Sequence, residues 1–262
     1  MTRIRQIDAF TNEPFRGNPA GVCILSGPAD KVWMQSVAAE MNVAETAFLW
    51  PVDDGFSLRW FTPTTEVDLC GHATLASAHA LWESGTLESS RQAVFSTKSG
   101  ILTADREGDW IVLDFPSEPR VEEIEREPIE AAIGTDVLGV FRNRFDYLAE
   151  VSSEREVTDL SPDLRAIRAM GCRGLIVTAR GEHPDRDFVS RFFAPSVGVD
   201  EDPVTGSAHC FLAPYWSEKL GGNELTGYQA STRGGVVGVE LHGDRVRLKG
   251  QAITVLDGEL ID

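Results

Sequence analysis

Lysine and long apolar runs are scarce in this sequence of 262 residues. Of its 24 Lys and Arg residues only four are lysine, the formal net charge is −17, and no basic run occurs. Because binding to nucleic acid or anionic lipid needs clustered Lys and Arg, we expect neither partner. No stretch approaches the ~20 apolar residues of a membrane span, and the N-terminus shows no signal-peptide or presequence pattern. We therefore expect a cytoplasmic protein that does not contact a membrane.

Motifs for nucleotides, metals and disulfides are missing as well. No GxGxxG follows a strand and no GxxxxGK[ST] occurs, so a nucleotide cofactor would have no phosphate loop. The five histidines form no HExxH and have no carboxylate at metal spacing. The four cysteines, Cys23, Cys70, Cys172 and Cys210, lie far apart without a CxxC, which predicts buried thiols rather than a disulfide framework. We expect no cofactor and no metal.

One short corner occurs twice. Arg59 to His72 reads RWFTPTTEVDLCGH, and Arg191 to His209 reads RFFAPSVGVDEDPVTGSAH. A shift of 132 positions (191 − 59) aligns Arg59 with Arg191, Phe61 with Phe193, Pro63 with Pro195, Val67 with Val199 and Asp68 with Asp200. With 42% hydrophobic residues there is enough apolar surface for two cores. The repeat favours two domains of about 130 residues over one large domain.

Strands dominate the pattern, and each half contains one long apolar helix. Strands are predicted at residues 3–10, 21–25, 47–50, 57–61, 93–97, 100–104, 110–115, 147–151, 175–178, 187–193, 225–231, 235–241, 245–249 and 252–260. Helices are predicted at 30–42, capped by Asp30, and at 72–85, 162–170 and 206–222, where Pro214 should kink or break the helix. The acidic stretch 117–134 interrupts the β pattern. We expect domains at 1–116, joined by the strand at 252–262, and at 117–251.

The helices at 72–85 and 206–222 are apolar on nearly every side. Such a helix must be enclosed, and the surrounding strands form a sheet long enough to curl around it. The fold class expected is α+β. Each helix begins with a glycine, Gly71 after Cys70 and Gly206 after Thr205. Unpaired N–H groups and the helix dipole make such a start an anion site, although ordinary helix capping explains the same residues.

Several polar residues near these helix starts can be interpreted either as structural or as functional residues. Glu45 begins an apolar strand and is either a partly exposed loop charge or a carboxyl in an apolar pocket, suited to proton transfer. Asp202 precedes a proline and is typical of a turn or a cap, and His72 at a helix start is typical of a cap. Asp68 and Asp200 are typical of turns. The residues alone leave these readings open.

Four separated motifs, taken together, resemble the phenazine-biosynthesis PhzF-like family, which belongs to the diaminopimelate epimerase fold. They are FTNEPFRGNPAGV (Phe10 to Val22), NVAETAFL (Asn42 to Leu49), RWFTPTTEVDLCGHAT (Arg59 to Thr74) and DEDPVTGSAH (Asp200 to His209). The resemblance covers essentially the whole chain in the same order. It implies two pseudo-symmetric domains, each a mainly antiparallel sheet wrapped around a central helix, with the active site in the cleft between them. It also implies a homodimer.

The resemblance further implies cofactor-free isomerase chemistry, in which a proton moves on a small carboxylated substrate. Glu45 would be the general acid/base, with His72, Asp202 and Ser207 as polar partners around the reacting carbons. Substrate binding would involve Gly71 and Gly206 with the adjoining Cys70 and Thr205, the substrate carboxylate being held by backbone N–H groups.

Two alternatives remain. The wider fold includes racemases and epimerases that use one cysteine from each half as opposed acid and base. Cys70 stands at the first thiol position, but counting four residues back from Ser207, as Cys70 stands from Thr74, gives Pro203, which argues against a two-thiol mechanism. A Cys70-assisted epimerase is one alternative. The other is a member without catalytic activity that binds a small acid or a protein.

Overall fold

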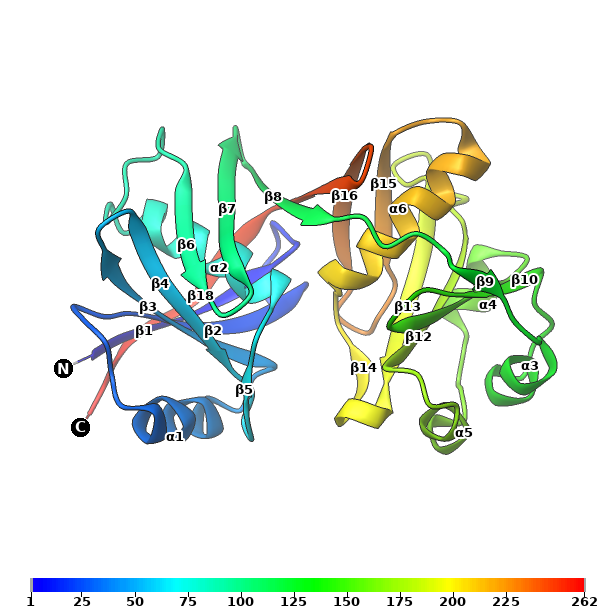
Figure 1. The fold of residues 1–262 in the computed structure, drawn as a ribbon, viewed down its shortest axis with the longest axis horizontal. Helices are drawn as coiled ribbons and strands as arrows, with labels where there is room; N and C mark the ends of the chain where they lie inside the picture. The colour runs from blue at the N-terminus through cyan, green and yellow to red at the C-terminus, as the bar shows by residue number, and fades with distance from the viewer. Residues whose placement is uncertain (1, 262) are drawn as a thin grey trace. The chain divides into compact units, whose positions relative to one another are not determined.

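The computed structural model describes residues 2–261. Their contacts divide the chain into two compact units. Unit 1 contains the residues up to Asp114 together with those from Lys249 onward, and unit 2 contains Phe115–Leu248. The chain therefore passes between the units twice, within strands β8 (Trp110–Pro116) and β17 (Arg245–Gly250). The elements of each unit can be followed by colour in Figure 1.

Unit 1 is a mainly antiparallel sheet. Its other strands are β1 (Thr2–Ala9), β2 (Asn18–Ile24), β3 (Glu45–Val52), β4 (Gly55–Phe61), β5 (Glu66–Val67), β6 (Ala93–Thr97), β7 (Gly100–Glu107) and β18 (Ala252–Leu260). Strand β1 lies between β18 and β2 and is antiparallel to both. Two pairs are parallel, β2 with β3 and β4 with β6. The last segment of the chain thus completes the sheet that the first segment begins.

Two helices pack on this sheet (Figure 1). Helix α1 (Lys31–Met41) begins where the Asp30 carboxylate accepts hydrogen bonds from the backbone N–H groups of the second and third residues after it. The helix packs on Cys23, Phe48 and Phe61. Helix α2 (Gly71–Glu83) contacts β1, β2, β3 and β18. Ten of its residues are buried, which leaves no polar face. An apolar helix enclosed by strands is the arrangement predicted from the sequence.

Unit 2 repeats this pairing scheme. Its strands are β9 (Glu122–Glu123), β10 (Gly139–Arg142), β11 (Asp146–Glu150), β12 (Gly174–Arg180), β13 (Phe188–Ala194), β14 (Val199–Asp202), β15 (Glu224–Gln229) and β16 (Gly235–His242). Again two pairs are parallel, β11 with β12 and β13 with β15, and the remaining pairs among these strands are antiparallel. Each unit is therefore a mainly antiparallel sheet with two parallel pairs.

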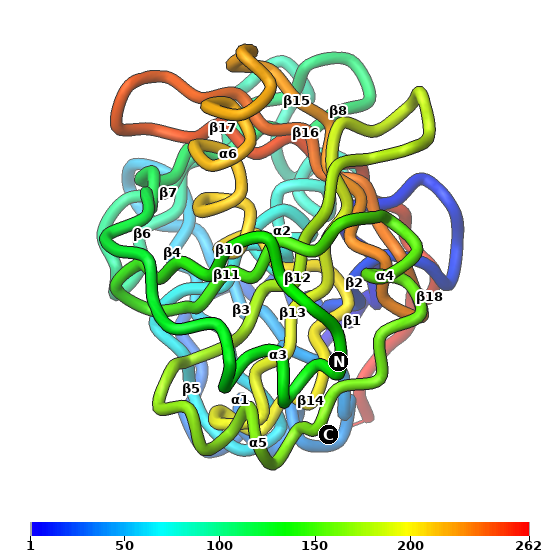
Figure 2. Tube along the Cα trace, turned by 90° about the vertical axis from the view of Figure 1, so that its right-hand side faces the viewer, coloured from blue at the N-terminus to red at the C-terminus, as the bar shows by residue number. Residues whose placement is uncertain are grey.

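Helix α6 (Gly206–Leu220) is the enclosed helix of unit 2 and contacts β15 and β16. Shorter helices cover other parts of the sheet, namely α3 (Glu127–Ile133), α4 (Glu154–Thr158) and α5 (Leu164–Ala169). Their apolar residues share a core with Val177, Val189 and Phe193 of the strands. Figure 2 looks onto α3 and α5 of this unit.

Pro214 was expected to kink or break the helix; a break is wrong, because α6 continues through Pro214 to Leu220. A proline has no N–H for the carbonyl four residues earlier, which is that of Cys210. The backbone N–H of Glu118 donates to this carbonyl at 3.0 Å. The segment that follows β8 thus supplies the hydrogen bond that proline removes, and the buried carbonyl is not left unsatisfied.

The predicted strands all occur, with ends that shift by a few residues, and α1, α2, α5 and α6 begin and end close to the predicted positions. The sequence analysis missed α3 and α4, which lie in or after the acidic stretch, and the short strands β5, β9, β10 and β14. All four cysteines are buried thiols. Within residues 2–261, no helix is long and apolar enough to cross a membrane.

The two corners share their contacts but not their length. Arg59 Nε lies 2.8 Å from Glu66 Oε1 and Arg191 Nε lies 2.7 Å from Glu201 Oε1. Each guanidinium also lies over a phenylalanine ring, at 5.2 Å from the centroid of Phe61 and 4.9 Å from that of Phe193. The second corner, however, contains an extra turn, the 3₁₀ helix Pro195–Val197 followed by Gly198 in the left-handed region (φ 88°).

This extra turn corrects the alignment made from the sequence. Trp60 pairs with Val67, seven residues on (67 − 60), whereas Phe192 pairs with Asp202, ten residues on (202 − 192). Beyond the turn the offset is therefore 135 rather than 132, and the helix starts Gly71 and Gly206 agree with it (206 − 71). Asp68 and Asp200 are not counterparts, and Asp200 lies in strand β14 rather than in a turn. The structural counterpart of Cys70 is Thr205 and not Pro203.

Candidate active site

Glu45 is the first residue of β3 and pairs with Ala20 of the parallel strand β2. Alternate side chains of a strand point to opposite faces. Because Phe48, three residues on, packs against α1, Glu45 lies on the other face, which α2 covers. Its side chain is 20% exposed. Glu45 is thus a strand residue rather than a loop residue, with a side chain that is mostly enclosed but still partly exposed, and its role stays a prediction.

His72 and Cys70 lie beside this carboxyl at the start of α2. The Nε2 atom of His72 lies 3.3 Å from Glu45 Oε2, and its Nδ1 atom lies 3.5 Å from Cys70 Sγ. Both residues are buried, at 6% and 7% exposure. The imidazole therefore stands between a thiol and a carboxyl, with one ring nitrogen directed to each.

Burial lowers the pKa of His72 to about 3, because a charged imidazole would lose its hydration there. The ring is therefore neutral near pH 7. Within the described residues its Nε2 makes no hydrogen bond of good geometry, so the 3.3 Å approach of Glu45 is neither an ion pair nor an aligned hydrogen bond. A neutral imidazole can donate one proton and accept another, and the two nitrogens can exchange these roles.

By distance, the same three residues could hold a metal ion. One ligand atom from each of Glu45, Cys70 and His72 lies within 4.8 Å of the others. Carboxylate oxygen, thiolate sulfur and imidazole nitrogen are all ligands of Zn²⁺. In the alternative, proton transfer by Glu45, the same side chains would act on the substrate directly and not through a metal ion.

The residues of interest in unit 2 gather around the start of α6. Thr205 precedes the helix, and its Oγ1 donates to Asp202 Oδ2 at 2.5 Å. Gln229, fully buried at the end of β15, accepts from the Thr205 N–H at 2.8 Å and donates to the carbonyl oxygen of Asp202 at 2.8 Å. Gln229 also donates to Thr205 Oγ1 at 3.1 Å. These contacts fix the carboxyl of Asp202 relative to the helix start.

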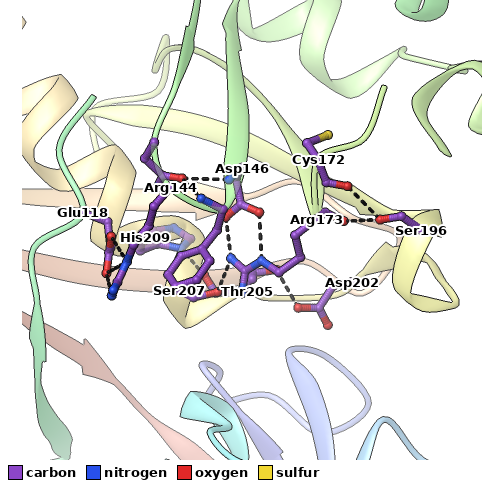
Figure 3. Close-up of polar contacts among 12 residues, drawn as sticks. Glu118, Arg144, Asp146, Cys172, Arg173, Ser196, Asp202, Thr205, Ser207 and His209 are labelled. Atoms are coloured by element: carbon purple, nitrogen blue, oxygen red, sulfur yellow. Dashed lines mark hydrogen bonds and ion pairs between the residues drawn. The ribbon is translucent and has the colours of Figure 1, made fainter. Parts of the chain in front are cut away.

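Ser207, in the first turn of α6, contacts an arginine that the sequence analysis did not select. Arg173 Nη2 donates to Ser207 Oγ at 3.1 Å, and the same guanidinium makes a two-point contact with the carboxylate of Asp146 (Figure 3). Asp146 is 1% exposed. Burial raises the pKa of Asp146, and the neighbouring guanidinium only partly offsets this.

Gly71 and Gly206 are the first residues of α2 and α6. Neither preceding side chain, among these described positions, accepts a hydrogen bond from its helix, although Cys70 and Thr205 occupy the N-cap positions. The first N–H groups of a helix have no carbonyl partner within it. The N-cap side chains therefore do not compete for these donors, as the anion-site interpretation requires, and the plain capping interpretation of Cys70 and Thr205 loses its main contact.

The structure thus groups the selected residues within each unit. Glu45, Cys70, Gly71 and His72 lie together in unit 1, and Asp202, Thr205, Gly206 and Ser207 lie together in unit 2. The sequence analysis missed Gln229, Arg173 and Asp146. Gln229 is one of several polar residues in the strand ELTGYQ, so nothing local distinguished it, and nothing local marked the other two.

The arrangement of strands and helices identifies the fold class of the protein. Two units of mainly antiparallel strands, each with an enclosed helix, form a diaminopimelate epimerase-like fold. A predicted epimerase of Pseudomonas aeruginosa has the same fold, with a TM-score of 0.79 at 21% identity and with both chains covered completely. At that identity the likeness shows the fold alone.

The family model for phenazine biosynthesis-like proteins matches residues 7–258, and the chain belongs to this PhzF-like family. It is 56% identical over 261 residues to an uncharacterized isomerase of Halalkalibacterium halodurans. This match covers 99% of the present chain and 98% of the relative. A crystal structure of a PhzF family protein from Enterococcus faecalis superposes with a TM-score of 0.93 at 38% identity, with 99% of each chain covered.

Proposed function

We propose that the chain is an isomerase that moves a proton on a small carboxylated substrate, with Glu45 as general acid/base. The isomerase class follows from the family and from curated relatives that carry this name. The observation that supports the role of Glu45 is its position 3.3 Å from the buried, neutral imidazole of His72. An imidazole with a pKa of about 3 is a poor base near pH 7, so the carboxyl is the better group to accept a proton.

The reaction proposed is an allylic shift. The substrate carboxylate binds at the start of a glycine-led helix, where the N–H groups and the helix dipole favour an anion. Glu45 removes a proton from a carbon next to an unsaturated system and returns it to another carbon on the same face. One carboxyl can perform both steps when water is excluded, because the proton then need not exchange fully with solvent.

The other residues have supporting roles in this proposal. His72 orients the substrate or passes the proton, since its neutral ring offers one donor and one acceptor. Asp202 and Ser207 would be polar partners of the substrate, as the family resemblance implies. Thr205 and Gln229 hold Asp202 in place through their hydrogen bonds to its side chain and its carbonyl oxygen.

A solvent-exchange assay tests the role of Glu45. The protein is incubated in D₂O with a panel of β,γ-unsaturated carboxylates, cyclic and acyclic, and deuterium and double-bond position are followed by NMR. We expect the wild type to incorporate deuterium and shift the double bond, and Glu45→Gln to be slower by about 10²–10⁴-fold. A Glu45→Gln protein within a few-fold of wild type would refute the role, and a protein that binds acids with neither deuterium incorporation nor a double-bond shift would be a binding member of the family.

Cys70 supports a second candidate, an epimerase assisted by this thiol. The observation in its favour is the 3.5 Å contact between Sγ and Nδ1 of His72, since an imidazole can activate a thiol. Two observations weigh against it. A thiolate–imidazolium pair would require His72 to be charged, which burial opposes, and the counterpart of Cys70 in unit 2 is Thr205 rather than a second thiol. In the exchange assay, Cys70→Ser should stay within several-fold of wild type if Glu45 is the base.

A further inference from the structure

Arg173 is held more firmly than a surface arginine. Its Nε donates to Asp146 Oδ1 at 2.8 Å, and its Nη2 contacts Asp146 Oδ2. Two rings lie beside the guanidinium, Phe145 at 5.2 Å and Phe192 at 5.7 Å from their centroids. A two-point carboxylate contact combined with aromatic neighbours fixes the plane of a guanidinium.

Asp146 is itself fixed. It begins β11 and pairs with Gly174 of the parallel strand β12, and its backbone N–H donates to Asn143 Oδ1 at 2.7 Å. Burial lowers the pKa of Arg173, but the hydrogen bonds and charge of Asp146 more than offset this and raise it, so the guanidinium stays charged. The pair therefore presents charged N–H groups to Ser207, and the negative charge of Asp202 also acts on the guanidinium, since it contributes to the raised pKa of Arg173.

Ser207 meets this guanidinium with a hydroxyl group. A hydroxyl group has one hydrogen to donate and two lone pairs to accept with. Arg173 Nη2 occupies one lone pair at 3.1 Å, and a nearby positive charge makes the hydroxyl a weaker acceptor and a stronger donor. The O–H hydrogen must then point away from the guanidinium.

We propose that Arg173, held by Asp146, is a positioning residue that makes Ser207 a hydrogen-bond donor to the substrate carboxylate. The inference rests on the proposed function, because it assigns the direction of the hydrogen bond that Ser207 makes in that site. Figure 3 shows the chain of contacts from Asp146 through Arg173 to Ser207. The alternative is an ion pair that only stabilises unit 2.

Arg144 provides a matched control. It also lies over the ring of Phe145, at 4.4 Å from the centroid, and it pairs with Glu118. Its side chain is 63% exposed. Arg144→Gln therefore removes the same charge from the same neighbourhood without removing the contact to Ser207.

The test is a double-mutant cycle on carboxylate binding, with benzoate as the probe. Benzoate is titrated into ¹⁵N-labelled protein, and the amide signals of Gly206 and Ser207 report binding. The variants are Arg173→Gln, Ser207→Ala, the double variant, Arg173→Lys and Arg144→Gln. Thermal unfolding of each variant establishes that it is folded.

We expect Arg173→Gln and Ser207→Ala each to weaken benzoate binding by about tenfold, as for loss of a charge-assisted hydrogen bond. If Arg173 acts through Ser207, the double variant binds no more weakly than Ser207→Ala. Arg173→Lys keeps the charge without the two-point contact and should be intermediate, and Arg144→Gln should stay within about twofold. If Arg173→Gln does not fold, the double-mutant cycle combines Arg173→Lys with Ser207→Ala, and Arg144→Lys is the matched control.

Four results would overturn the inference. They are benzoate binding by Arg173→Gln within twofold of wild type, an equal loss in Arg144→Gln, additive losses in the double variant, and unshifted Gly206 and Ser207 amides in the wild type. None of these measurements depends on turnover. Failure of Glu45→Gln to slow exchange would therefore refute the proposed function separately, and failure of the cycle would leave the role of Glu45 standing.

Discussion

The side chain of His72 matters both for the proposed chemistry and for the stability of unit 1, because burial favours its neutral form. Its pKa is about 3 in the folded protein, against 6.5 for an ordinary imidazole. Between these values the unfolded chain binds a proton that the folded chain does not. The part of the stability that depends on a neutral His72 is therefore fully present above pH 6.5 and is lost as the pH falls towards 3.

We expect the free energy of unfolding to fall by up to about 1.4 kcal/mol per pH unit for this one proton across that window. His209, whose pKa burial lowers to about 4, adds to the slope in the same direction. Urea titrations from about pH 7 to about pH 4 measure the slope. His72→Gln should remove one part of it and leave the part that belongs to His209. An unchanged slope in His72→Gln would mean that the folded protein already carries a charged imidazole at position 72.

At the scale of elements, the two corners have the same Arg–Glu pair in different surroundings. The side chain of Glu66 is 3% exposed and contacts Lys31 and Lys98 in addition to Arg59. The Arg59 hydrogen bond is the main cause that lowers its pKa to about 2. Glu201, at 23% exposure, pairs with Arg191 alone among the ion pairs described for it. The first corner therefore depends more on its carboxylate than the second.

We expect Glu66→Gln to lower the free energy of unfolding near pH 7 by about 1–2 kcal/mol, a figure reduced for screening by solvent, and Glu201→Gln to lower it by less. The sign follows from the lowered pKa. The stabilisation by Glu66 is present above pH 4.5 and is lost as the pH falls towards 2. The difference between wild type and Glu66→Gln should therefore shrink below pH 4.5. Equal effects of the two substitutions at neutral pH would contradict this account.

The corners also show how far the sequence predicts the structure. Periodicity and caps predicted the strands and the helix starts because these signals are local, as with Asp30 before α1. The extra turn Pro195–Val197 was not predicted, since the Arg, Phe, Pro, Val and Asp letters align at 132 positions (191 − 59) whether or not a turn lies among them. Strand pairing, which is a contact between distant residues, showed that Thr205 is the counterpart of Cys70.

Some polar residues of the site could likewise be selected from the sequence, and others could not. Glu45, His72, Asp202 and Ser207 lie in recognisable motifs, so the sequence was enough to select them. Arg173 lies 27 residues from Asp146 and 34 residues from Ser207. Nothing in the sequence around an arginine that precedes an apolar strand distinguishes it from an arginine on the surface. Such a residue is found only when the pairing of β11 with β12 brings it to the start of α6.

At the scale of the whole molecule, the path of the chain makes unit 1 discontinuous. Strand β18, from the end of the sequence, pairs with β1 from Thr2 to Ala9, and β1 lies between β18 and β2. Gly250, just before β18, lies so close to Phe10 and Leu75 that a Cβ atom would come within 2.4 Å of the Phe10 ring. The segment from Lys249 onward therefore contributes both a strand and core contacts to unit 1.

Two fragments test this dependence. A fragment of residues 1–114 lacks β18, which leaves β1 with one strand neighbour and uncovers part of α2, so we expect it to be insoluble or to lack a cooperative thermal transition. Adding residues 249–262 through a flexible Gly/Ser linker of about ten residues should restore cooperative unfolding, because it replaces unit 2 by a short connection and keeps the strands of unit 1. Unfolding is followed by circular dichroism and by one-dimensional NMR of the buried methyl groups. If residues 1–114 alone unfold cooperatively at the same temperature as the linked fragment, the C-terminal strand adds nothing to the stability of unit 1, and the pairing of β18 with β1 is not what holds that sheet together.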